Sequence, residues 1–246
     1  MNPRSSVQIH IGKDPVQLCK NLAEWIIECI ADVLRSRDHF NLVLSGGNTP
    51  RQLYELLAQS PYREKIAWSQ LHIFFGDERY VPFDDKRNNG RMAQDVLLNH
   101  VAIPSSQIHY LRTDLQPEES AAEYETILKS LFSEKEISFD LVLLGMGDDG
   151  HTLSLFPGYE IIFEKERWVK SVYNIEQKEQ RITLTAPIVN KSASIAFLVT
   201  GIQKSTTIKS VIQGNNDPEK FPCQIIKPIT GSLHWFIDEA AASLIS

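Results

Sequence analysis

The sequence predicts an α/β fold in which a mainly parallel, Rossmann-like sheet lies between helices on both faces. Short apolar runs such as Phe139 to Leu144 are almost unbroken, as in strands that are buried on both sides. Segments with apolar residues at helical spacing separate these runs. Glycine follows several of them directly and permits a sharp turn. Right-handed crossovers between parallel strands would place the loops that follow the strands at one edge of the sheet.

The first half of the chain alternates strands and helices. Val7 to Ile11 alternates like a strand, and Asp14-Pro15 then opens a helix that we expect to reach about Arg37. Thr49 is the expected cap of the next helix, because Pro50 suits its first position. The other elements predicted here are strands at 40–44, 71–75 and 108–111, a polar loop at 84–90, and helices at 91–100 and 117–132.

The second half continues the alternation. Thr152 is expected to cap a short helical segment that Pro157 stops. The other elements predicted here are strands at 139–144, 168–173 and 195–199, an exposed polar connection at 174–180, a helical turn from 186, and helices at 203–212 and 232–245. We find no repeat or linker and expect one domain over residues 1–246.

Composition narrows the function classes. The chain has 246 residues and a formal net charge of -6, which argues against a nucleic-acid or anionic-membrane partner but is compatible with one basic pocket for a phosphate. Its three cysteines lack C-x-x-C spacing, and Cys19 and Cys29 lie in an apolar helical pattern, as expected for core thiols. The sequence contains no apolar targeting segment or membrane-length run, and we expect a cytoplasmic protein.

The stretch Gly145 to His151, GMGDDGH, is the strongest candidate for a reactive site. It directly follows a predicted buried strand, where ligands bind in open α/β sheets. Asp148, Asp149 and His151 supply acid and base groups. Residues 145–150 also match the dinucleotide-binding motif G-x-G-x-x-G. A pyrophosphate bound there would face two aspartates, however, and Pro157 leaves little room for the helix that the motif requires. A structural turn with an exposed histidine is the other alternative.

Three further features follow predicted strands. The loop Ser45-Gly46-Gly47-Asn48-Thr49 before a helix is typical of an anion site, although a tight turn that binds nothing has the same pattern, and no Walker lysine follows. The charges of Asp77-Glu78-Arg79 are costly at a buried strand end unless they are paired or used, and a structural Asp-Arg pair is the alternative. Lys204 begins a helix, where a cation is unfavourable unless an anion lies nearby; a solvent-facing lysine is the alternative.

Five motifs resemble the 6-phosphogluconolactonase family: SGGNTPRQLYELL from Ser45, FFGDERYVP from Phe74, GMGDDGHTLSLFPG from Gly145, RITLTAPIVN from Arg181 and TGIQK from Thr200. The resemblance covers nearly the whole chain. It implies the glucosamine-6-phosphate deaminase-like fold and hydrolysis of 6-phosphoglucono-1,5-lactone to 6-phosphogluconate, the second step of the oxidative pentose phosphate pathway. It also implies that the reaction needs no metal or organic cofactor. The expected partner is a phosphorylated sugar lactone, with no nucleic acid or membrane, and we expect a monomer.

The resemblance also places the family's site residues. Its histidine falls on His151, its Asp-Glu-Arg motif on Asp77 to Arg79, and its glycine loop on Ser45 to Thr49. This sequence departs from the family in three places. Asn48 stands where the family loop usually has serine, Leu153 replaces a usual small residue, and Asn88-Asn89 stands where the family commonly has a serine-asparagine pair. Of that pair, Asn89 is the expected contact.

The residues suggest a mechanism for lactone hydrolysis, which needs an activated water and a site for the oxyanion. We expect His151 to act as general base, oriented by Asp77 or Asp149. Arg79 or backbone N–H groups are the candidates for holding the oxyanion. The predicted substrate and phosphate contacts are Ser45, Gly46, Gly47, Asn48, Thr49, Asn89, Arg181 and Lys204.

Two other functions remain open from the sequence. A glucosamine-6-phosphate deaminase shares the fold implied by the resemblance, but that family has a glutamate near its histidine where this chain has Ser154 to Pro157. A sugar-phosphate sensor without catalysis would keep the pocket, although the intact His151 argues against it. No G-x-S-x-G elbow is present, which disfavours an acyl-enzyme mechanism.

Overall fold

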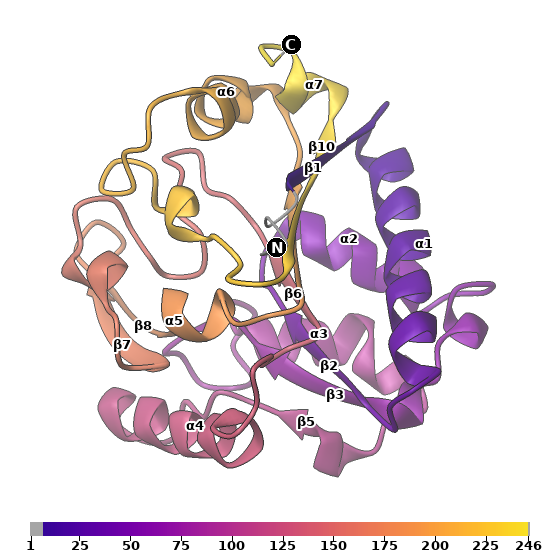
Figure 1. Ribbon diagram of the computed structural model, residues 1–246. Coiled ribbons are helices and arrows are strands. Elements are labelled where there is room, and N and C mark those ends of the chain that lie inside the picture. The colour runs from indigo at the N-terminus through magenta and orange to yellow at the C-terminus, as the bar shows by residue number, and fades with distance from the viewer. Residues whose placement is uncertain (1–6, 246) are drawn as a thin grey trace.

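A large parallel sheet forms the centre of the molecule (Figure 1). The computed structural model describes residues 7–245, and within them seven strands are arranged in the order β1-β10-β9-β6-β2-β3-β5, every neighbouring pair parallel. The strands are β1 (Val7–Gly12), β2 (Phe40–Leu44), β3 (Leu71–Phe75), β5 (Ile108–His109), β6 (Leu141–Leu144), β9 (Ser194–Val199) and β10 (Ser232–Asp238). The predicted mainly parallel sheet is confirmed.

Helices cover both faces of this sheet. The chain passes from β1 through β2 and β3 to β5 in one direction along the sheet, and from β6 through β9 to β10 in the other. Right-handed crossovers therefore place the helices of the two halves on opposite faces, and Figure 1 shows α1 and α2 on the side opposite to α4, α5 and α6. The helices are α1 (Pro15–Leu34), α2 (Asn48–Leu57), α3 (Asn89–Val96), α4 (Pro117–Phe132), α5 (Ala186–Val189), α6 (Ser205–Gln213) and α7 (Glu239–Ala242).

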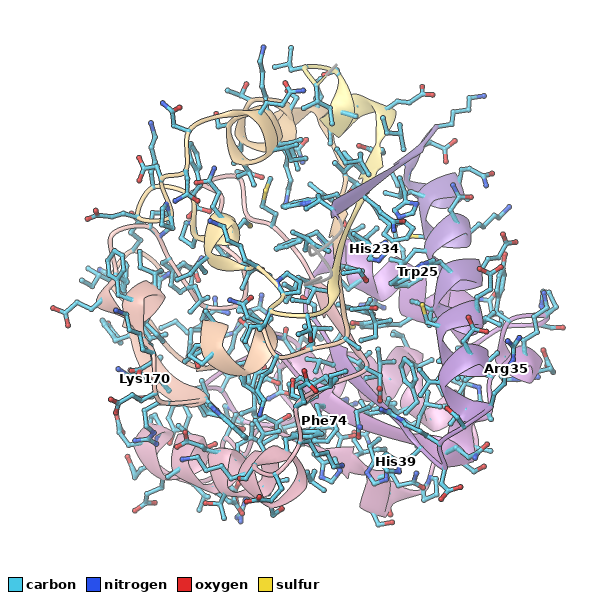
Figure 2. The ribbon with its side chains drawn as sticks, in the orientation of Figure 1. Trp25, Arg35, His39, Phe74, Lys170 and His234 are labelled. Atoms are coloured by element: carbon cyan, nitrogen blue, oxygen red, sulfur yellow. The ribbon has the colours of Figure 1, made fainter. Side chains whose placement is uncertain are left out.

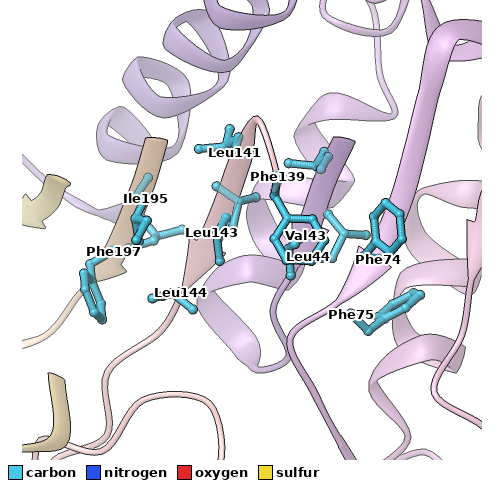
Figure 3. Close-up of a cluster of buried hydrophobic side chains, with 14 of the residues drawn as sticks. Val43, Leu44, Phe74, Phe75, Phe139, Leu141, Leu143, Leu144, Ile195 and Phe197 are labelled. Atoms are coloured by element: carbon cyan, nitrogen blue, oxygen red, sulfur yellow. The ribbon is translucent and has the colours of Figure 1, made fainter. Parts of the chain in front are cut away.

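The core lies where these layers meet. All four residues of β6 are buried, and Figure 3 shows Leu141, Leu143 and Leu144 between Ile195 of β9 and Val43 of β2, with Phe74 of β3 beyond Val43. Helix α1 contributes a buried stripe with Leu18, Cys19, Leu22, Ile26 and Ile30, and its first turn is capped by Asp14, whose Oδ1 accepts a hydrogen bond from the Gln17 backbone N–H at 2.8 Å. Cys19 and Cys29 are free thiols, as expected.

A second sheet lies outside the parallel one. Strands β4 (Asp77–Arg79), β8 (Glu179–Leu184) and β7 (Val169–Asn174) pair antiparallel in the order β4-β8-β7. Arg79 lies directly opposite Arg181 in this register. The exposed connection predicted over 174–180 is wrong at both ends, because Asn174 is buried in β7 and β8 begins at Glu179.

The C-terminal helix predicted over 232–245 is also wrong. Residues Ser232–Asp238 form β10, which lies between β1 and β9, and only Glu239–Ala242 is helical. Trp235 to Ile237 is an apolar run whose residues are all buried, a pattern that a buried helix shares. Figure 2 shows His234 beside Trp25 of α1, and their ring centroids are 4.5 Å apart.

Three predicted helix starts also differ. Helix α2 begins at Asn48 after Gly47, whose φ of 106° suits glycine, so Thr49 is not its cap. Thr152 caps no helix, because the residues after it form a turn in which Thr152 and Leu155 make an isolated bridge. Helix α3 begins at Asn89, inside the predicted loop, because Asn88 caps it by accepting from the Arg91 backbone N–H at 2.8 Å. None of the helices in residues 7–245 combines the length and apolar character that a membrane span requires.

Candidate active site

The loops after β2, β3, β6 and β9 meet at the carboxyl edge of the parallel sheet. The chain order reverses between the neighbouring strands β6 and β2, which makes the edge above them the topological switch point where open α/β sheets bind ligands. The two loops are close together there, since a Cβ added to Gly145 would lie 3.8 Å from Ser45 Oγ. A cleft of about 270 Å³ opens at this position.

The cleft gathers nearly all of the predicted site residues, although the chain separates some of them by more than a hundred positions. Eleven of the twelve line it: Ser45, Gly46, Gly47, Asn48, Thr49, Asp77, Arg79, Asn89, His151, Arg181 and Lys204. The twelfth, Asp149, does not line the cleft but contacts His151. The structure therefore brings the imidazole and the cationic side chains into one cavity.

His151 is oriented by Asp149. Its Nδ1 lies 2.6 Å from Asp149 Oδ1, and the His151 backbone N–H donates to the same oxygen at 3.0 Å. Partial burial raises the pKa of the Asp149 carboxyl, but the hydrogen bonds from His151 outweigh it and the net pKa is lowered. An Nδ1–H that donates to the carboxylate leaves Nε2 as a proton acceptor. Gly147 makes this pair possible, because a Cβ there would lie 2.1 Å from His151 Nδ1.

Asp77 is held by a different group. Its Oδ2 accepts a hydrogen bond from Ser154 Oγ at 2.7 Å, and the side chain is buried at the cleft wall. Of the two carboxylates considered for orienting the imidazole, Asp149 is therefore the one in contact with it.

Arg79 is held at the cleft by Asn89. Arg79 Nη1 donates to Asn89 Oδ1 at 2.9 Å and to the Arg87 carbonyl at 2.6 Å. Asn89 in turn donates to the Asp77 carbonyl at 2.9 Å and packs on Gly46, where a Cβ would lie 2.0 Å from Asn89 Oδ1. Within residues 7–245, Arg79 forms no ion pair with Asp77, so the alternative of a structural Asp-Arg pair does not apply.

Arg181 is almost buried beside a second guanidinium. It faces Arg79 across the β4–β8 pair, and like charges directly opposite each other are unfavourable unless an anion lies between them. Burial lowers the pKa of Arg181. Its Nη2 donates to Gln177 Oε1 and lies 3.0 Å from Glu179 Oε2, while its buried Nε has no hydrogen-bond partner among the described residues.

Lys204 reaches the cleft from the segment between β9 and α6. It ends the 3-10 turn Ile202–Lys204 just before α6, which begins at Ser205 and not at Gln203 as predicted. Its Nζ donates to the Met146 carbonyl and lies 3.8 Å from Asp148 Oδ1. The cation therefore contacts the glycine loop that carries His151, and the alternative of a solvent-facing lysine does not apply.

The loop Ser45 to Thr49 presents a helix N-terminus to the cleft. Gly47 precedes α2, whose first backbone N–H groups have no intrahelical partner and favour an anion. The dinucleotide alternative for residues 145–150 is not supported, because no helix follows Gly150 in the described chain before a short 3-10 turn at Glu160–Phe163.

Comparison with known proteins decides the family. Residues 13–235 match the family of glucosamine-6-phosphate isomerases and 6-phosphogluconolactonases. The chain belongs to this family. A 6-phosphogluconolactonase from Synechocystis is 38% identical over 216 residues, which cover 86% of this chain and 87% of the relative. The predicted family is confirmed.

Solved structures of family members share the fold. The crystal structure of 6-phosphogluconolactonase from Thermotoga maritima has a TM-score of 0.80 and 29% identity and covers 95% of this chain and 100% of its own. A monomeric glucosamine-6-phosphate deaminase has a TM-score of 0.82 at 20% identity, with 97% of this chain and 99% of its own covered. The predicted three-layer, deaminase-like fold is confirmed.

Three residues of this family member support the site through contacts that the sequence analysis did not predict. Glu78 is buried and accepts from the backbone N–H groups of Arg79 at 2.8 Å, Asn89 at 2.7 Å and Gly90 at 2.8 Å, which ties β4 to the start of α3. Burial raises the pKa of Glu78 to about 7, against the lowering effect of these donors. Tyr54 holds the loop after β2, since its hydroxyl bonds the Ser45 backbone N–H and carbonyl. Gln177 lines the cleft beside Arg181.

Proposed function

We propose that this protein hydrolyses 6-phosphoglucono-1,5-lactone to 6-phosphogluconate, as a step of the oxidative pentose phosphate pathway. One observation carries the proposal: the His151–Asp149 pair shares a single cleft with Arg79, Arg181 and Lys204. A base and three cations in one cleft suit a substrate that carries both a reactive carbonyl and a phosphate. Membership of the family and the relatives named as 6-phosphogluconolactonases support the same reaction.

The proposed chemistry begins at His151. Its Nε2 takes a proton from a water molecule as the water oxygen attacks the lactone carbonyl carbon. The carbonyl π bond opens to an oxyanion, and Asp149 stabilises the imidazolium that forms. When the oxyanion collapses, the bond between the carbonyl carbon and the ring oxygen breaks, and the ring oxygen takes the proton from His151. The reaction transfers no electrons to an acceptor, so the proposal includes no redox cofactor. As the family resemblance implies, it includes no metal either.

The other cleft residues bind and stabilise in this proposal. Arg79 or backbone N–H groups hold the oxyanion, while Arg181, Lys204 and the loop Ser45 to Thr49 bind the phosphate, with Asn89 fixing Arg79. Asp77, at the wall of the cleft, holds Ser154 in place by accepting its hydroxyl hydrogen bond. Binding the remote phosphate positions the carbonyl next to the base, which lowers the entropic part of the barrier.

The decisive experiment is the His151→Asn variant. Loss of the base is expected to lower kcat by at least about a hundredfold, the usual scale of general base catalysis, while the fold is kept. NMR can follow opening of the lactone with and without enzyme, since the compound also opens unaided. The exposed His100→Gln variant serves as control. An unchanged rate in His151→Asn would refute the assignment, and binding of 6-phosphogluconate by a wild type that never turns over the lactone would indicate a sensor.

The deaminase alternative is not favoured. The position of that family's glutamate is occupied in this chain by Ser154 to Pro157, and Ser154 is already bound to Asp77. The cytoplasmic location and the monomeric state remain part of the proposal. Cell fractionation and sedimentation at micromolar concentration test them, and a stable dimer would overturn the second.

A further inference from the structure

The turn between β7 and β8 holds one side chain over the cleft. Asn174 is buried and its Oδ1 accepts from the Gln177 backbone N–H at 2.7 Å, while the Tyr159 hydroxyl accepts from the Ile175 backbone N–H at 2.9 Å. Two hydrogen bonds therefore fix the backbone of an exposed turn. Figure 1 shows the β7–β8 hairpin at the side of the molecule away from α1. Within this turn, Gln177 lines the cleft and its neighbours Ile175 and Glu176 do not.

Gln177 acts directly on the guanidinium of Arg181. Arg181 Nη2 donates to Gln177 Oε1 and pairs with Glu179 Oε2 at 3.0 Å, so two acceptors hold one edge of the planar group. The guanidinium is not fully satisfied, because its buried Nε has no hydrogen-bond partner within the part of the chain that the structure describes. A buried donor on a charged group is costly when it lacks a partner, so a ligand anion that reaches Arg181 has a hydrogen bond to gain.

The neutrality of Gln177 is the important property. Arg181 already has one carboxylate partner in Glu179, and Arg79 lies opposite it in the strand register. A second carboxylate at position 177 would keep the hydrogen bond but cancel the positive charge available to a ligand. An amide accepts the same hydrogen bond and leaves that charge in place.

We infer that Gln177 is a specificity-determining residue, whose neutral amide orients Arg181 at the cleft without neutralising it and so favours substrates that carry a phosphate dianion. The inference rests on the proposed function for the identity of the substrate. It assigns Gln177 a role in binding the phosphate and none in the proton transfers at His151.

The test compares three variants of the full chain. Gln177→Glu keeps the acceptor and adds a charge, and Gln177→Met removes the acceptor without adding one. Ile175→Glu adds the same charge on the same turn at an exposed side chain outside the cleft. We expect Gln177→Glu to raise KM for the phosphorylated lactone, and the Kd of 6-phosphogluconate measured by calorimetry, about fivefold, the scale of a partly exposed charge interaction. Its kcat should stay within about twofold, since the step at His151 is untouched.

The controls separate this role from simpler ones. Gln177→Met should raise KM less than Gln177→Glu, and Ile175→Glu should leave it unchanged. Three outcomes would overturn the inference. An equal rise in KM for Gln177→Glu and Ile175→Glu would show only a long-range effect of charge, and an equal rise for Gln177→Glu and Gln177→Met would show that the neutrality of the amide does not matter. A loss confined to kcat would contradict a role in binding. Because calorimetry needs no turnover, a failure of the proposed reaction would be seen in the wild type and would leave the binding comparison intact.

Discussion

At the residue scale, the geometry of the proposed active site depends on positions that carry no side chain. Gly147 leaves room for the His151–Asp149 pair, and Gly46 leaves room for Asn89 beside Arg79. In each case the missing Cβ is replaced by a polar atom of the site. The glycines of the two loops therefore leave space for neighbouring polar side chains, in addition to allowing the chain to turn.

Replacing Gly147 by alanine should consequently damage catalysis more than folding. The added Cβ would lie 2.1 Å from His151 Nδ1 and 2.6 Å from Asp149 Oδ1, so the pair must separate. We expect kcat to fall by about a hundredfold, as for loss of general base catalysis, with a small change in the thermal midpoint. Gly145→Ala is the matched comparison, since its Cβ would make only an ordinary 3.8 Å contact with Ser45 Oγ. Similar kcat losses in both variants would contradict the proposal that Gly147 is needed to leave space for the His151–Asp149 pair.

The structure explains one of the departures from the family pattern, the pair Asn88-Asn89. Asn88 caps α3 and Asn89 contacts Arg79, so the neighbouring asparagines have different tasks. Leu153 lies in the left-handed region with a φ of 54° and covers Gly76, where a Cβ would lie 2.6 Å from Leu153 Cδ2. The structure gives no account of the benefit of leucine over a smaller residue at that place.

Most of the proposed site could be predicted from residue types, because His151, Arg79 and Lys204 follow predicted strands, and ligands bind at the carboxyl ends of such strands. Glu78 and Gln177 were harder to recognise as contributors, because their roles depend on partners elsewhere in the fold. Glu78 bonds backbone N–H groups eleven and twelve residues away, which no side-chain motif reveals. Gln177 lies in a turn whose position over the cleft depends on the small antiparallel sheet.

At the element scale, β10 joins the two ends of the chain and contains a histidine that titrates unusually. His234 Nδ1 lies 3.1 Å from His10 Nε2 of β1, and the ring is buried against Trp25. Burial, with a smaller contribution from His10, lowers the pKa of His234 to about 4 from 6.5. The unfolded chain therefore binds more protons than the native one between these two pH values, and stability is lost as pH falls through that range.

The variant His234→Gln should lose less stability on acidification than the wild type. Its thermal midpoint at pH 5 should lie closer to its midpoint at pH 7, because the buried imidazole no longer opposes protonation. Other histidines with a lowered pKa, such as His109, will keep part of the wild-type slope. The exposed His100→Gln variant should retain the full slope. Parallel curves for wild type and His234→Gln would contradict this explanation.

The prediction of β10 failed for a physical reason. Its apolar run is buried and lies between the paired strands β1 and β9, and the segment after it, Glu239 to Ala242, is a good helix former. The two patterns join without a glycine or proline between them, so the helix was extended backwards over the strand. Strands that end in glycine, such as β3 and β6, were placed correctly at their carboxyl ends.

At the scale of the whole molecule, one hydrophobic core connects both sheets. Ile182 of the small sheet and Ile195 of the large sheet are both fully buried in the same cluster. The domain prediction for residues 1–246 therefore leads us to expect that the two sheets unfold together, although the structure describes residues 7–245 only.

Matched substitutions in the two sheets test this expectation. Ile182→Val and Ile195→Val each remove one buried methylene, and each should lower the free energy of unfolding by about 0.5–1.5 kcal/mol. Circular dichroism and tryptophan fluorescence during urea unfolding should give coincident transitions in both variants. Two separate unfolding transitions, of which Ile182→Val shifts only the first, would show that the small sheet unfolds as a separate unit.

The position of β10 has a consequence for synthesis on the ribosome. The first strand of the chain pairs with the last, and β10 separates β1 from β9. Until residue 238 has left the exit tunnel, β1 has no neighbour in the sheet, and the inner edge of β9 is open as well. A nascent chain of this protein must therefore carry β1 unpaired while the residues up to β10 are made, and the edge of β9 that β10 covers stays open from Val199 onward.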